Sequence, residues 1–161
     1  MSDDDFDWSL RRGRTPTGRT GPDADHSYGN TSGTYIHIES SNRLFMERAK
    51  IESPIMNSFL LGQNQCEFSL YYHMYGDDVW ELRACVQMLA DGSCFQGNPV
   101  VASSNQGNIW KKYTQALPAS QGQFKVFEYF HLCHTSNNSK TPTQGTRIQI
   151  TDISVTVAFI P

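Results

Sequence analysis

The sequence predicts an all-β protein, specifically an antiparallel β-sandwich of jelly-roll type. Three observations predict this fold. Apolar and polar residues alternate with a period of two in many short segments, turn-forming residues separate these segments, and no segment has a convincing helical period. The 161 residues are enough for one domain with a hydrophobic core and too few for two ordinary ones, so we expect a single domain over 1–161.

Residues 1–33 are expected to be largely loop, because Gly and Pro recur between 13 and 22. Phe6 and Trp8 share parity, which favours a short strand or a docking segment at the start. A loop of this length is unusual in a compact domain, and it suggests a function or ordering by a ligand.

Regularly spaced strands are expected along the rest of the chain. They are 34–39, 49–55, 66–76, 80–88, 100–103, 110–117, 124–133 and a final segment from 148 to 159.

The segment 66–76 has the clearest alternation, with aromatic residues on both faces. One face carries Cys66, Phe68, Leu70, Tyr72 and Met74, and the other carries Glu67, Ser69, Tyr71, His73 and Tyr75. This pattern is typical of a half-buried strand.

Two local features refine the strand layout. Asp91-Gly92 predicts a hairpin turn, since Asp-Gly accepts the positive φ of a two-residue type I′ turn. In the last segment the apolar parity changes at Thr151-Asp152, which predicts a β-bulge there.

Composition limits the function classes. The formal net charge of −3 provides no basic footprint for nucleic acid, and no apolar run is long enough to insert into a membrane. No signal peptide is visible, so the chain is expected to be either cytosolic or a mature domain of a longer precursor. Four cysteines and the sequons at Asn30 and Asn137 favour an extracellular, glycosylated protein.

Several motifs, in order, resemble those of the MAM domain, an extracellular module of meprin proteases, neuropilin-type receptors and receptor tyrosine phosphatases. The matching segments are 5–8 (Asp-Phe-Asp-Trp), 20–22 with Asp25-His26, 33–36, 49–54, 66–76, Leu82-Arg83, 105–110, 124–128 and 151–154. The resemblance implies a jelly-roll sandwich and covers about nine tenths of the chain.

The chain departs from the family pattern at both ends. The family's first cysteine-containing strand and its last cysteine, the usual partner of the residue at Cys66, have no counterpart here. The sequence is therefore expected to be a divergent or truncated member.

The disulfide pairing has three possible connectivities. We favour Cys85–Cys94, which requires a hairpin longer than two residues or shifted in register, with Cys66–Cys133 as the remaining pair. In a reducing compartment all four would be free thiols.

Asp5, Asp25 and Asp152 are candidate ligands of a structural calcium ion, because carboxylates are hard oxygen donors and the resemblance implies a cation between the N-terminal segment and the last strand. The alternative is a solvated acidic N-terminus and a carboxylate that caps a bulge.

Tyr71 and Tyr75 are candidate binding residues because tyrosine is enriched in interface hot spots, with core packing as the alternative. Arg12 and Arg14 belong to the chain's basic cluster and could bind an acidic partner or glycosaminoglycan, unless they lie in a solvated loop. His37 and His73 are expected at the surface or between the sheets. No G-x-S-x-G or catalytic triad order appears, so no enzyme activity is expected.

The function expected first is a non-catalytic extracellular adhesion module that binds a protein partner, including a second copy of itself, within a larger secreted or membrane-anchored protein. The alternative is a calcium-dependent carbohydrate-binding jelly roll. Neither function involves nucleic acid or direct membrane insertion.

Overall fold

The computed structural model describes residues 4–16, 18, 20–39, 47–58, 65–76, 79–119, 122–132 and 147–158, with the backbone alone at 39, 65, 79–80, 127–132 and 147–158. The strands are β1 (Ser9–Arg12), β2 (Thr34–Glu39), β3 (Arg48–Glu52), β4 (Met56–Asn57), β5 (Gln65–Tyr75), β6 (Val79–Met88), β7 (Cys94–Phe95), β8 (Val100–Ser103), β9 (Lys111–Ala116), β10 (Gln123–Leu132) and β11 (Arg147–Ala158).

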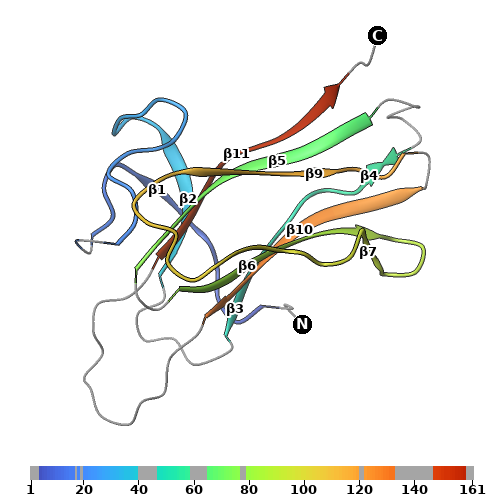
Figure 1. The fold of residues 1–161 in the computed structure, drawn as a ribbon, viewed down its shortest axis with the longest axis horizontal. Helices are drawn as coiled ribbons and strands as arrows, with labels where there is room; N and C mark the ends of the chain where they lie inside the picture. The colour runs from blue at the N-terminus through green and yellow to red at the C-terminus, as the bar shows by residue number, and fades with distance from the viewer. Residues whose placement is uncertain are drawn as a thin grey trace.

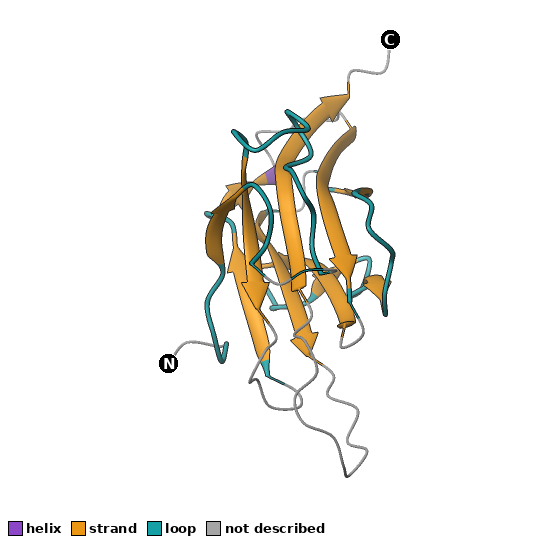
Figure 2. Ribbon diagram, turned by 90° about the vertical axis from the view of Figure 1, so that its left-hand side faces the viewer, coloured by secondary structure: helices purple, strands orange, loops and turns teal. Residues whose placement is uncertain are grey.

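These strands form two sheets that face each other, as Figures 1 and 2 show. The first sheet has the order β1-β2-β11-β5-β9, and the second has the order β3-β10-β6-β7 with β4 beside β10 and β8 beside β6. The described strand pairs are antiparallel. From β4 onward the chain crosses repeatedly between the sheets, and the predicted jelly-roll sandwich is confirmed.

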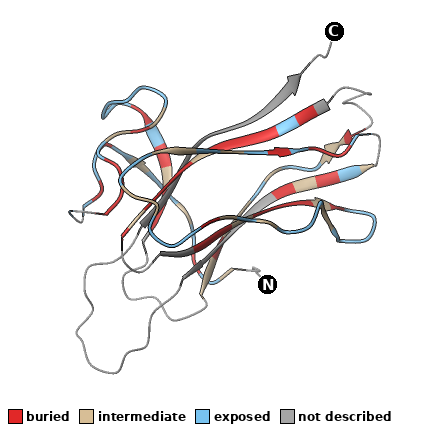
Figure 3. Ribbon diagram, viewed as in Figure 1, coloured by how far each residue is buried: buried red, intermediate tan, exposed pale blue. Residues whose placement is uncertain are grey.

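The hydrophobic core lies between the sheets. The apolar parity of β5 points inward, and Leu70 and Met74 belong to one buried cluster with Leu82 and Val86 of β6 and Phe124 of β10. The buried segments of β5 and β6 in Figure 3 lie on facing sheets. Burying such side chains is the main favourable contribution to folding, at about 1.5–3 kcal/mol for each large aliphatic or aromatic residue.

The N-terminal segment joins the two sheets before β1 begins. The Asp5 amide donates to the Arg48 carbonyl at 2.8 Å, and the Arg48 amide donates to an Asp5 carboxylate oxygen at 2.9 Å. Phe6 is buried in the core and Trp8 packs against it. This segment is therefore a docking segment, one of the two forms that the shared parity of Phe6 and Trp8 predicts.

The predicted strands are confirmed with small shifts at their ends, and β1, β4 and β7 add to them. The predicted bulge is also present, because the register of β11 against β5 shifts between Thr151 and Ser154. The hairpin predicted at Asp91-Gly92 is confirmed, because β6 and β7 pair antiparallel around it, but the predicted two-residue length of its turn is wrong. Met88 bonds Ser93 through a 2.8 Å backbone hydrogen bond, and the turn therefore contains the four residues 89–92.

A charged cluster lies across β3 and β10. Glu52 of β3 bonds Lys50 of its own strand at 3.0 Å and also bonds Lys125 of β10. The hydrogen bonds from Lys125 and then Lys50 hold the pKa of Glu52 below its ordinary value of 4.5. The ionised form of Glu52 thus contributes to the stability of this sheet edge.

Replacing Leu70 by alanine is expected to lower the free energy of unfolding by about 2–5 kcal/mol, because it leaves a cavity in a fully buried site. Leu10 provides the matched control. Its cross-strand partner Ile36 places it on the same face of the first sheet as Leu70, but 76% of Leu10 is exposed. Leu10→Ala should change stability by no more than about 0.5 kcal/mol. Chemical denaturation measures both, and equal losses would contradict this placement of the core.

The Glu52 cluster is expected to weaken in acid. Because the pKa of Glu52 is lower in the folded chain than in the unfolded chain, its contribution is complete above about pH 4.5 and is lost as pH falls through the folded pKa. Solvent screens the partly exposed cluster, so the loss is about 0.2–1 kcal/mol. Denaturation of the parent and Glu52→Gln between pH 3 and 7 measures it, and an unchanged stability difference across this range would refute it.

Candidate interaction surface and its supporting loop

The N-terminal loop, residues 13–33, covers part of the outer face of the first sheet. Tyr35 and His37 of β2 and His73 of β5 point away from the core, yet all three are buried, and His73 is 1% exposed. The predicted location of the two histidines, at the surface or between the sheets, is therefore wrong. A second, smaller packed layer covers part of this face of the sheet.

Trp110 is the central contact between this loop and the sheet. Its indole nitrogen donates to the Ala24 carbonyl at 3.1 Å, and its ring meets His73 edge to face at 5.4 Å between centroids. His26 of the loop stacks on Tyr71 at 3.5 Å. The Tyr35 hydroxyl donates to the Gly13 carbonyl at 2.6 Å. These contacts attach the loop at its beginning and its middle.

Asp25 organises the tip of the loop from inside. Its carboxylate accepts hydrogen bonds from the Tyr28 amide at 2.8 Å and the Asn30 amide at 3.3 Å, and 3% of the residue is exposed. A Cβ atom at Gly33 would lie 2.0 Å from the Asp25 carboxyl carbon. Residue 33 must therefore be glycine, since any side chain would displace the buried carboxylate.

The structure places the three predicted calcium ligands on separate elements. Asp5 bonds Arg48 of β3, Asp25 bonds the loop tip, and Asp152 lies in the bulge of β11. In the described part of the chain, no three His, Cys, Asp or Glu side chains form a group that could hold a metal ion. The Asp152 side chain lies outside the described residues, so the three-residue calcium site stays a prediction.

β1 is an outer edge of the first sheet and presents a mixed apolar and basic surface. Leu10 is exposed between Ser9 and Arg11. Arg12 donates to the Thr34 hydroxyl at 2.9 Å, and Arg14 forms an exposed ion pair with Asp23 at 3.1 Å. We call Leu10, Arg12 and Arg14 the β1 edge surface. Both arginines are oriented by the fold and still accessible to a partner.

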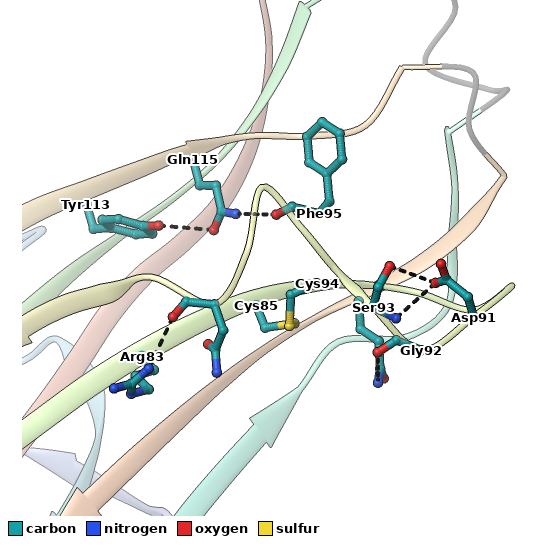
Figure 4. The surroundings of a disulfide bond; sticks show 11 residues. Arg83, Cys85, Asp91, Gly92, Ser93, Cys94, Phe95, Tyr113 and Gln115 are labelled. Carbon is teal, nitrogen blue, oxygen red and sulfur yellow. Dashed lines mark hydrogen bonds between the residues drawn. A yellow bond between two sulfur atoms is a disulfide. The ribbon is translucent and has the colours of Figure 1, made fainter.

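The hairpin between β6 and β7 carries a disulfide. Gln87 pairs with Cys94 across the strands, and the predicted Cys85–Cys94 bond is confirmed (Figure 4). The turn is closed by Asp91, whose carboxylate accepts bonds from the Ser93 hydroxyl at 2.7 Å and amide at 2.9 Å. These bonds, the hydroxyl bond first, lower the pKa of Asp91.

The same hairpin contacts the other sheet. Gln115 of β9 donates to the Phe95 carbonyl at 3.3 Å and accepts a bond from the Tyr113 hydroxyl at 3.0 Å (Figure 4). Cys66 is buried and forms no disulfide with a described residue, and the predicted Cys66–Cys133 bridge stays a prediction. Cys133 lies outside the described residues.

The other candidate residues have varied surroundings. Tyr71 is half-buried under His26, and Tyr75 meets His73 edge to face at 6.3 Å. Their role in binding stays a prediction. Asn30 is exposed at the loop tip, and Asn137 lies outside the described residues.

Sequence reasoning missed several important residues of this region. The contacts of Trp110 with Ala24 and of His26 with Tyr71 could not be read from the sequence, because the residues of each pair lie far apart along the chain. The exposure of Leu10 and Tyr28 was also missed, although both are large side chains at the surface. The unusual length of the loop was the one available signal that it is ordered.

Comparison with known proteins identifies the class of this domain. The profile of the MAM domain, meprin/A5/mu, matches residues 1–156, and the chain belongs to this family. Family membership confirms the predicted location outside the cell.

Three relatives give the context. The chain is 42% identical over 122 residues to thyroid hormone-induced protein B of Xenopus laevis, covering 75% of this chain and 17% of that protein. It is 34% identical over 137 residues to MAM domain-containing glycosylphosphatidylinositol anchor protein 2 of Rattus norvegicus, covering 78% and 14%. It is 31% identical over 130 residues to neuropilin-1a of Danio rerio, covering 77% and 13%.

The chain therefore spans less than a fifth of the length of these relatives. In the described part of the chain, no helix is long and apolar enough to cross a membrane.

Gly33→Ala is expected to release the loop tip, because the new methyl group overlaps the Asp25 carboxylate. Chymotrypsin should then cleave after Tyr28 in the loop tip faster than in the parent, as measured by mass spectrometry of timed digests. Gly18→Ala is the matched control, since a Cβ atom at Gly18 meets nothing within 4 Å. Equal cleavage rates in the two variants would show that Asp25 does not hold the loop.

Removing the disulfide by the double substitution Cys85→Ala with Cys94→Ala is expected to lower the free energy of unfolding by about 2–3 kcal/mol, because the unfolded chain gains loop entropy. Reductant should destabilise the parent similarly and leave the double variant unchanged. Urea denaturation with and without reductant measures this. A parent insensitive to complete reduction would contradict a stabilising role.

Proposed function

We propose that this domain is a non-catalytic interaction module that binds a protein partner through the β1 edge surface, within a larger secreted or membrane-anchored protein. The observation that carries the proposal is Leu10, which is 76% exposed on an edge strand beside oriented arginines. Family membership supports the general class of function.

The chemistry of this surface favours an extended acidic segment as partner. An edge strand offers unpaired backbone groups that another strand can bond. The exposed leucine supplies apolar contact area, and arginine is enriched in protein interfaces because its guanidinium group bonds carboxylates in two places. The positive charge is local, since the whole chain has a formal net charge of −3. Such a surface would select acidic partners over basic ones.

The N-terminal loop gives the β1 edge surface a fixed shape. Arg12 bonds Thr34, and Arg14 bonds Asp23 inside the loop that Trp110 attaches to the sheet. A preorganised surface loses less conformational entropy when it binds. The carbohydrate-binding alternative gains no support from Tyr71, because His26 already occupies one face of its ring.

The test is a binding assay on the secreted parent protein or its full ectodomain. Arg12→Glu combined with Arg14→Glu should weaken partner binding at least tenfold, by reversing two charges in the surface. The matched control is Lys112→Glu, an exposed residue of β9 at the opposite edge of the same sheet.

Bead aggregation and sedimentation of the isolated domain separate self-association from binding to a different protein. The proposal fails if the arginine and lysine variants lose binding equally. It also fails if both retain it fully.

A further inference from the structure

The exposed tip of the N-terminal loop carries a tyrosine and an asparagine two residues apart. Residues 27–32 are all exposed, and Tyr28 is 73% exposed. A large aromatic side chain in this position has no role in the core or in the contacts that attach the loop. Asn30 follows two residues later and begins the triplet Asn30-Thr31-Ser32, a potential acceptor for N-linked carbohydrate.

The triplet forms a turn in which the side chains of Asn30 and Ser32 are hydrogen-bonded to each other. The Asn30 carboxamide oxygen accepts hydrogen bonds from the Ser32 amide at 2.8 Å and from the Ser32 hydroxyl at 2.5 Å. Both bonds join residues two positions apart, so the turn can form before the rest of the domain folds. The hydroxyl that the acceptor triplet requires is thus held against the carboxamide that would be modified.

We propose that Asn30 carries an N-linked glycan whose first sugar stacks on the ring of Tyr28. In the modification, the Asn30 Nδ2 atom forms a bond to the anomeric carbon of the sugar. The bond between this carbon and the diphosphate of a lipid-linked oligosaccharide donor breaks, the lipid diphosphate leaves, and the amide loses one proton. The reaction needs no oxidant or reductant.

The geometry of the tip directs the sugar toward Tyr28. Gly29 has a φ of +64°, a left-handed conformation that glycine adopts readily, and the chain bends between the two residues. The Asn30 Nδ2 atom donates to the Tyr28 carbonyl at 3.3 Å, so the attachment atom lies against the residue that carries the exposed ring. The apolar face of a sugar ring packs well on an aromatic ring, and here neither partner has to be uncovered first.

The glycan would also stabilise the loop. The Tyr28 and Asn30 amides both bond the buried Asp25 carboxylate, which fixes the backbone on either side of Gly29. A sugar held between Asn30 and Tyr28 adds a contact across the same turn. This inference depends on the exposed loop tip and not on which partner the domain binds.

Occupancy is tested on protein secreted from animal cells, with Asn137→Gln in every version so that one acceptor triplet remains. Peptide N-glycosidase in ¹⁸O-labelled water converts a modified asparagine to labelled aspartate, which peptide mass spectrometry locates. We expect label at position 30 and its loss in Ser32→Ala. Secreted protein that is unlabelled at position 30 overturns the proposal.

The stacking is tested by a double-mutant cycle on the same material, after an endoglycosidase has trimmed the glycan to its first sugar. The cycle compares Tyr28 with Tyr28→Ala, each with the sugar and, through Ser32→Ala, without it. We expect the sugar to raise the melting temperature about 2 °C more when Tyr28 is present. Equal shifts in the two backgrounds overturn the contact between sugar and ring.

Discussion

The structure depends on the burial of β5 on both of its faces. One face, with Leu70 and Met74, packs into the core between the sheets. On the other face Ser69 and His73 are also buried, and His73 packs against Trp110, which bonds the N-terminal loop. Since successive side chains of a strand point to opposite faces, a shift of one residue would place histidine in the core and methionine under the loop. Two-sided burial therefore determines the register of the whole first sheet.

Much of the fold could be predicted from the sequence because strand alternation is a local signal. The inward parity of 66–76 and the change of parity at Thr151-Asp152 both match the structure. The length of the hairpin turn could not be predicted from Asp91-Gly92 alone. The Asp91 side chain bonds Ser93, and the chain closes between Met88 and Ser93, so four residues form the turn. The hydrogen bonds from Ser93 to the Asp91 carboxylate therefore outweigh the preference of Asp-Gly for a two-residue turn.

The candidate surface was less predictable, because it depends on contacts between distant residues. Trp110 bonds Ala24, 86 positions earlier, and His26 stacks on Tyr71. No periodic pattern encodes such pairs. Arg12 and Arg14 were identified from their charge, whereas the exposure of Leu10 depends on where the sandwich ends. The aromatic candidates Tyr71 and Tyr75 also have partners that the sequence does not reveal. Tyr71 stacks on His26 of the loop, and Tyr75 packs edge to face on His73.

The positions of β1 and β11 determine how the domain responds to tension. Both strands are antiparallel to β2, which lies between them, so β1 and β11 run in the same direction. Force applied to the two ends of the domain would pull these strands in opposite directions along their length. The hydrogen bonds of an antiparallel ladder lie perpendicular to that pull and would share the load, instead of opening one after another.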